Sequence, residues 1–103
     1  YLYIGQTVAV KHKAIVAVEA LEGTDNLSRR AGCIARGNFT VVKVSKPKQD
    51  VRFDIPVVGI NTIKNIAKAR GSCLAIEAKK TIFLDKESSV RLADKKGISI
   101  VAV

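Results

Sequence analysis

Runs of β-branched and other apolar residues, separated by short polar segments, recur along most of the chain. Two runs near the start, residues 6–11 and 14–20, are separated only by His12-Lys13, which is the spacing of a two-residue β-hairpin, although the turn has no glycine. Further runs predict strands over residues 39–45, 73–77, 81–84 and 98–103. Residues 53–59 predict a short extended segment, in which Pro56 excludes a central position in a sheet.

Three segments between these strands have helical periodicity and helical end signals. They cover residues 24–36, 61–70 and 85–96, and a glycine follows each of them. Thr24 or Asp25 is expected to cap the first helix, and Asn61 or Thr62 the second. Ile63, Ile66 and Ala67 give the second helix one apolar face.

Strands that alternate with helices of about three turns predict an α/β fold, a layered mixed β-sheet with about three helices in a single domain. Hairpins, at residues 12–13 and around the tight connection 78–80, make the sheet mixed. Val and Ile occur at both parities of several strands, so both sheet faces are expected to be covered. The first residue is Tyr1 and the last run is apolar, so we expect a domain of a longer protein.

Composition and charge exclude several classes of protein. With 48% hydrophobic and 26% charged residues, the sequence is that of a globular domain and not of a disordered chain. No stretch approaches the roughly 20 apolar residues of a membrane span. The net charge of +9 favours anionic partners, namely nucleic acid, phosphorylated metabolites or an anionic bilayer. Two tyrosines and three phenylalanines are few for a protein that stacks bases.

Several chemical motifs are missing. His12 is the single histidine, so a histidine-based triad or cluster is excluded, and no glycine-rich nucleotide loop occurs. Cys33 and Cys73 are far apart among apolar neighbours, which favours buried, unpaired thiols over a disulfide.

The first candidate site is Glu22-Gly23-Thr24-Asp25, where a strand gives way to a helix. Backbone N–H groups at a helix start favour phosphate, and Gly23 allows close approach of a ligand. Glu22 and Asp25 would repel an anion unless a divalent cation lies between them. The alternative is an ordinary capping segment.

Two single charges are further candidates, because each shares a strand parity with apolar residues. Glu19 alternates with Ile15 and Ala17, so it lies either at the rim of the sheet or in a functional site. Lys43 alternates with Phe39 and Val41 and therefore needs a partner or a ligand, unless it is an inward charge that protects an edge strand.

The densest candidate is the segment 43–56, a Pro-interrupted loop rich in charge. Arg52 can form a forked contact with a phosphate, Lys43 and Lys46 can neutralise charge, and Asp54 can bind a hard cation or accept a proton. A solvated charged loop is the alternative.

Taken in order, these motifs resemble the C-terminal domain of the UDP-2,3-diacylglucosamine pyrophosphatases. The resemblance runs from Ile4 nearly to the end of the chain. Its motifs are Ile4-Gly5-Gln6, Val16-Ala17-Val18-Glu19-Ala20, Glu22-Gly23-Thr24-Asp25, Arg29-Arg30, Lys43, Lys46-Pro47, Gln49, Arg52-x-Asp54-x-Pro56, Gly59, Glu77-Ala78 and Leu84-Asp85-Lys86-Glu87.

The resemblance implies a catalytic C-terminal domain, residues 1–103, of a two-domain enzyme of lipid A biosynthesis in Gram-negative bacteria. Such an enzyme hydrolyses its substrate to 2,3-diacylglucosamine 1-phosphate and UMP with Mg²⁺ or another divalent cation such as Mn²⁺. Asp54 would be catalytic and a metal ligand, with Asp25 and Glu22 as further ligands. Lys43, Lys46, Arg52, Gly23 and Thr24 would bind the phosphates.

It further implies an N-terminal domain as partner, a cytoplasmic location at the inner membrane, and transient contact with that membrane. An isolated domain would then be nearly inactive, and no nucleic acid is expected as a partner. Two other classes remain open at this point: a basic nucleic-acid- or anion-binding module without catalysis, and a non-catalytic interaction domain.

Overall fold

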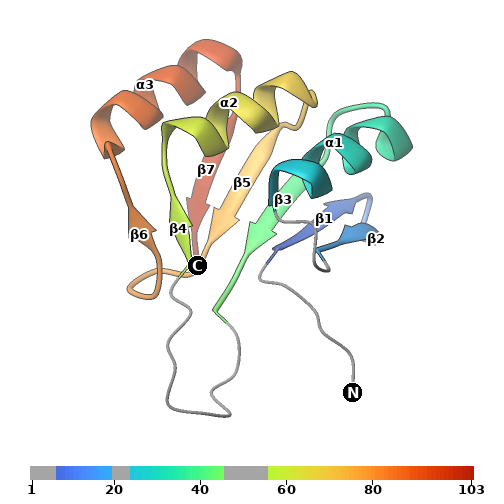
Figure 1. Ribbon diagram of the computed structural model, residues 1–103, viewed down its shortest axis with the longest axis horizontal. Helices are drawn as coiled ribbons and strands as arrows, with labels where there is room; N and C mark the ends of the chain where they lie inside the picture. Colours follow the sequence, from blue (N-terminus) through green and yellow to red (C-terminus); the bar gives the residue numbers. More distant parts are fainter. Residues whose placement is uncertain (1–6, 20–23, 46–55) are drawn as a thin grey trace.

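The computed structural model describes residues 7–19, 24–45 and 56–103, and within them the chain forms three helices, a five-stranded sheet and a two-stranded sheet (Figure 1). The elements are β1 (Thr7–Lys11), β2 (Ala14–Val18), α1 (Thr24–Ala35), β3 (Thr40–Lys43), β4 (Val57–Val58), α2 (Ile60–Lys68), β5 (Cys73–Ile76), β6 (Ile82–Phe83), α3 (Lys86–Lys96) and β7 (Ser99–Ala102). Their order is the predicted one, and the layered α/β class with a mixed sheet is confirmed.

The large sheet has the strand order β2-β1-β3-β5-β7. β1 is antiparallel to both β2 and β3, whereas β3, β5 and β7 are parallel, so α2 and α3 lie in the crossovers between them. The predicted hairpin is confirmed at His12 and Lys13, whose φ angles of 52° and 65° are the positive values that its two-residue turn requires.

The second expected hairpin, around residues 78–80, is wrong. β5 pairs with β3 on one side and with β7 on the other, so neither of its edges is free to pair with β6. β6 instead pairs in parallel with β4, through Val57 with Ile82 and Val58 with Phe83. β4 and β6 form a sheet of their own, in keeping with the exclusion of Pro56 from a central strand.

The hydrophobic core lies between the large sheet and the helices. One row of paired residues across all five strands faces it, namely Ala17, Ala9, Val41, Leu74 and Ile100. Leu27 and Ala31 of α1 and Ile63 and Ile66 of α2 pack against this row and are fully buried. The apolar face predicted for α2 is therefore confirmed.

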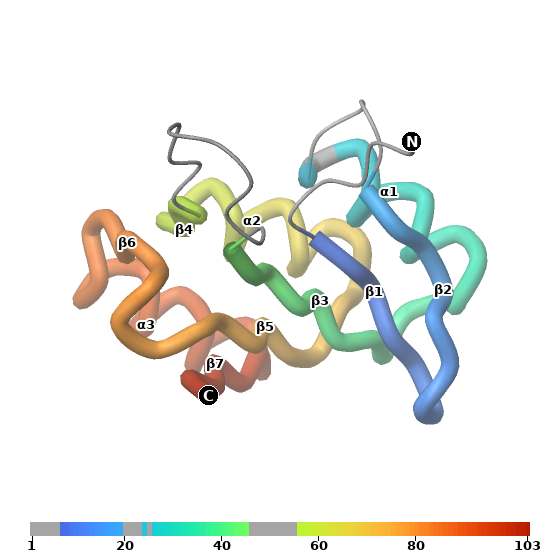
Figure 2. Tube along the Cα trace, turned by 90° about the horizontal axis from the view of Figure 1, so that it is seen from below, coloured from blue at the N-terminus to red at the C-terminus, as the bar shows by residue number. Residues whose placement is uncertain are grey.

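The opposite face of the large sheet is open in the part of the chain that the structure describes. The next row across the strands is again apolar, but none of its members is buried: Val18, Val8, Val42, Ala75 and Val101. Figure 2 shows all three helices on the other face of the sheet. The expectation that both faces are covered is thus wrong for the described residues.

A bulge in the β1–β2 pairing changes the parity on which the Glu19 argument rested. Ala9 pairs with Ala17, but Val10 pairs with Ile15, so Val16 is an extra residue. Ile15 therefore turns to the open face, where it is 69% exposed, while Ala17 stays in the core. Ile15 and Ala17 do not share a face, contrary to the prediction.

The helix limits differ from the predicted ones by one or two residues. α1 already includes Thr24, and α2 begins at Ile60, with Gly59 as its N-cap in place of Asn61 or Thr62. Thr62 acts from inside the first turn, because its Oγ1 accepts a hydrogen bond from the Gly59 N–H at 3.2 Å. No described helix is long and apolar enough to cross a membrane.

Candidate functional site

Lys43, one of the sequence candidates, is the last residue of β3, the central strand of the large sheet. The alternative that it protects an edge strand is therefore wrong. It points to the helical side of the sheet, as its parity with Val41 predicts, and its side chain is half-buried. A cation in this position needs hydrogen-bond partners, and the structure supplies them.

The Lys43 ammonium links two other elements. Its Nζ donates to the carbonyl oxygen of Val57 in β4 at 3.1 Å and to Oγ1 of Thr24 in the first turn of α1 at 3.4 Å. The Thr24 hydroxyl also bonds to Oγ1 of the fully buried Thr7 in β1, at 3.1 Å. One lysine thus joins the central strand, the start of α1 and the start of β4.

This placement brings together the flanks of both candidate segments. Thr24 belongs to the motif 22–25, Lys43 begins the segment 43–56, and Val57 directly follows that segment. A lysine beside the first turn of a helix combines a full positive charge with backbone N–H groups, which is suited to a phosphate. The described groups are thus fit to bind a phosphate oxygen.

A second polar contact at the same sheet edge joins β5 to the end of β3. Oε1 of Glu77 accepts hydrogen bonds from the backbone N–H of Ser45 at 2.6 Å and from its hydroxyl at 2.8 Å. These two bonds lower the pKa of Glu77 against an opposing effect of burial, and Lys80, whose Nζ lies 4.0 Å from Oε2, adds a weaker lowering. Sequence reasoning named Glu77 only as part of a family motif and not as a site residue, although it follows its strand just as Glu19 follows β2.

Glu19 lies directly after β2, which is an edge strand, and its side chain is half-buried. Its backbone N–H donates to the Thr7 carbonyl at 2.9 Å, so it continues the pairing with β1. This position matches the rim interpretation. The thiols of Cys33 and Cys73 are unpaired, as expected, but Cys33 is exposed and Cys73 only half-buried, because both side chains point away from the core.

The other candidate residues lie outside the described part of the chain, and their predicted roles stay predictions. They are Glu22, Gly23, Lys46, Arg52 and Asp54, together with the side chain of Asp25. Among the described residues, no group of three or more His, Cys, Asp or Glu side chains is arranged to hold a metal ion. Hydrogen bonds join the Lys43 ammonium to a hydroxyl and a carbonyl oxygen, and a fixed ammonium attracts an anion and repels a cation.

Comparison with known proteins identifies the family of the chain. The profile of the LpxI C-terminal domain matches residues 1–101. The chain belongs to this family. The match includes every segment of the site described above, those around Thr24, Lys43 and Glu77 as well as the residues outside the described part.

A curated member of the LpxI family is similar over nearly the whole chain. The UDP-2,3-diacylglucosamine pyrophosphatase LpxI of Caulobacter vibrioides is 34% identical over 110 aligned positions, which cover 99% of this chain. The chain spans only 39% of the length of that relative. The resemblance predicted from the sequence motifs is thereby confirmed at the level of the family.

Proposed function

We propose that this chain is the catalytic C-terminal part of an enzyme that hydrolyses the pyrophosphate bond of UDP-2,3-diacylglucosamine. The products would be 2,3-diacylglucosamine 1-phosphate and UMP, in lipid A biosynthesis. The family and the name of the Caulobacter relative support this proposal. The structural observation that carries it is the bridge from Lys43 to Thr24 and Val57, which joins the flanks of the two charged segments.

The reaction needs water to add to one phosphorus while the bond from that phosphorus to the bridging oxygen breaks. Negative charge then develops on the departing phosphate, and fixed cations nearby lower its energy. In the proposal Lys43, Lys46 and Arg52 hold the phosphate oxygens, and the backbone around Gly23 and Thr24 adds N–H donors at the start of α1. Asp54 orients the attacking water and accepts its proton.

A divalent cation is part of the proposal, with Mg²⁺ or Mn²⁺ as the candidates. When bound it would polarise a phosphoryl oxygen, and carboxylate oxygens are its preferred protein ligands. The described residues hold no group of three or more His, Cys, Asp or Glu side chains arranged for a metal ion, so in the proposal the cation would depend on Asp54, Asp25 and Glu22. The proposed role of Lys43 in holding a phosphate does not depend on the divalent cation.

The proposal makes this chain one half of the active enzyme. The Caulobacter relative has additional sequence beyond the matched 39%, and an N-terminal domain would account for it. The open sheet face, with its apolar row over five strands, offers such a domain a surface to pack against. The net charge of +9 supports work on an amphiphile at the anionic inner face of a membrane, in the cytoplasm.

The test is UMP release from UDP-2,3-diacylglucosamine by the full-length protein, with and without Mg²⁺. We expect metal-dependent release, and a loss of at least about 100-fold in kcat for Asp54→Asn, because the change removes a general base or metal ligand. Asp94→Asn, an exposed aspartate of α3, is the matched control with the same change of charge.

Near-normal turnover by a folded Asp54→Asn protein would remove Asp54 from the mechanism. No release by the folded parent protein would reject the proposed function. The next measurement would then be a salt titration of binding to nucleic acid, where a steep salt dependence without a Mg²⁺ requirement marks the alternative binding module.

A further inference from the structure

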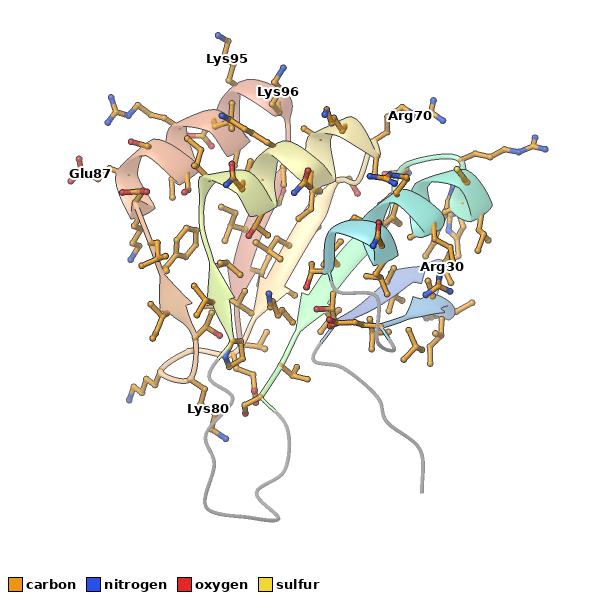
Figure 3. The ribbon with its side chains drawn as sticks, viewed as in Figure 1. Arg30, Arg70, Lys80, Glu87, Lys95 and Lys96 are labelled. Carbon is orange, nitrogen blue, oxygen red and sulfur yellow. The ribbon has the colours of Figure 1, made fainter. Side chains whose placement is uncertain are left out.

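A second polar feature, a hollow between α1 and α2, lies at the end of the helical layer away from Lys43. It measures about 390 Å³ and opens where both helices end. Four of its residues are cationic and none is acidic; the lining is Arg29, Gly32, Cys33, Arg36, Asn65, Lys68, Ala69 and Arg70. In Figure 3 the labelled Arg70 marks this end of α2.

The hollow follows from the way in which the two helices meet. A Cβ added to Gly32 would lie 2.7 Å from the Ala69 carbonyl oxygen, so α1 and α2 touch there backbone to backbone. Just beyond this contact, Arg36 and Arg70 leave their helices with positive φ angles of 58° and 66°. The chain therefore turns sharply after each of the two helices, at the rim of the hollow.

The cations are not needed to satisfy the helix ends, which is the ordinary role of basic residues in this position. Lys11 Nζ already donates to the carbonyl oxygens of Ala35 at 2.6 Å and Gly37 at 3.0 Å, at the end of α1. At the end of α2, the Ile66 carbonyl accepts the N–H of Gly71 at 2.9 Å. These carbonyl oxygens at the helix ends thus already accept hydrogen bonds from other groups.

Within the described part of the chain, the four cationic side chains of the hollow make no hydrogen bond or ion pair. The neighbouring Arg30 differs, because its Nη2 donates to the Val18 carbonyl at 3.0 Å. Like charges gathered around one concave site repel one another, and an anion with two or more charges would relieve that repulsion. Three of the four are arginines, whose forked donors match phosphate oxygens.

We propose that the hollow between α1 and α2 is a binding site for a phosphate group, carried by a free phosphate compound or by a phospholipid headgroup. This site is separate from the candidate site around Lys43 at the end of β3. Thr24 begins α1 and Arg36 follows its last residue, so the twelve residues of the helix, about 18 Å at 1.5 Å per residue, separate the two places. This inference does not rest on the proposed enzymatic function.

The test is titration of the protein with pyrophosphate at low ionic strength, followed by amide chemical shifts and by calorimetry. We expect saturable binding with shifts concentrated at residues 29–36 and 65–70. The double variant Arg36→Gln/Lys68→Gln should weaken the affinity by at least about tenfold, because two charged contacts are lost. Circular dichroism checks that the variant is folded.

The matched control is Lys95→Gln/Lys96→Gln, which removes the same charge from the end of the neighbouring helix, where Figure 3 shows both side chains projecting away from the protein. This control should change the affinity less than about twofold. An equal loss in both variants would overturn the proposal, because it would mean general attraction to a chain of net charge +9. Absence of saturable binding would overturn it as well.

Vesicles distinguish the two sources of the phosphate group. If phosphatidylglycerol vesicles bind the parent protein, if phosphatidylcholine vesicles and the hollow variant do not bind, and if pyrophosphate competes, the source is a headgroup. Saturable pyrophosphate binding without vesicle binding supports a free phosphate compound. Vesicle binding that the hollow variant retains in full, without pyrophosphate binding, overturns the proposal.

Discussion

The two ends of the helical layer use their charges differently. At the Lys43 edge, described charges have partners: Lys43 donates to Thr24 and Val57, and Glu77 accepts from Ser45. In the hollow at the other end, Arg29, Arg36 and their two cationic neighbours have no partner among the described residues. The first set therefore contributes to the stability of the fold in addition to its proposed role at a phosphate, whereas the donors of the second set are all left for a ligand.

The difference shows that charge counting alone does not locate a site. The sequence distributes its 18 basic residues evenly, nine before Phe53 and nine from there on, and neither end stands out in that count. The course of the backbone distinguishes the two ends. At one end, three elements meet where β3 ends; at the other, α1 and α2 come into close contact and the chain turns away after each helix.

The largest expected difference between the two ends is in stability. Lys43→Met keeps the aliphatic stem but removes both hydrogen bonds, and we expect a loss of about 1–3 kcal/mol in the free energy of unfolding. Arg36→Gln should change that free energy by less than about 0.5 kcal/mol, because the side chain is exposed and unpaired in the described structure. Urea denaturation measures both, and equal losses would remove the distinction.

Gly32→Ala is expected to have the next largest effect on stability, and it changes the helix contact beside the hollow without touching the Lys43 end. The new Cβ would lie 2.7 Å from the Ala69 carbonyl oxygen, so α1 and α2 must move apart. We expect a net loss of about 1 kcal/mol, since overpacking outweighs the helix propensity gained by alanine. Thermal unfolding reports the change.

Gly59→Ala is the control for this variant, because a Cβ there would meet Leu84 Cβ at an ordinary 3.5 Å. It should cost about 0.5 kcal/mol, the difference between the two residues as an N-cap. An unchanged or raised stability in Gly32→Ala would show that the helix contact is not tight.

The smallest effect concerns Glu77 and depends on pH. Its folded pKa is lowered by Ser45, so the stabilisation is present above the unfolded pKa, about 4.3, and is lost as the pH falls through the folded pKa. We therefore expect the urea midpoint to fall less steeply from pH 6 to pH 3 in Glu77→Gln than in the parent.

Glu87→Gln, on the exposed first turn of α3, is the matched control for this pH series. If parent and Glu77→Gln have the same pH profile, the contact with Ser45 does not stabilise the fold.

Local patterns predicted the elements well, because each carries its own periodicity and end signal. The hairpin at His12-Lys13, the apolar face of α2 and the inward direction of Lys43 all follow from residues close in sequence. The family followed from motifs whose order and spacing, taken together, are specific.

The predictions that were wrong concern features that depend on residues far apart in the sequence. The bulge at Val16 turns Ile15 outward, yet an extra residue leaves no mark on the strand pattern. The pairing of β6 with β4, and the open sheet face, are set by which edges and faces the rest of the chain occupies. The hollow between α1 and α2 depends on one helix contact, for which a single glycine was the only signal.

The open face of the large sheet also has a calorimetric consequence. Apolar surface raises the heat capacity change of unfolding, by about 0.45 cal/K/mol for each Å² that folding removes from water. Val8 and Val42 are only half-buried and Val101 is exposed in this chain, so their row adds less to that change than the buried row on the other face. A longer protein that packs another domain on this face would show a heat capacity change larger than the sum of its separate parts.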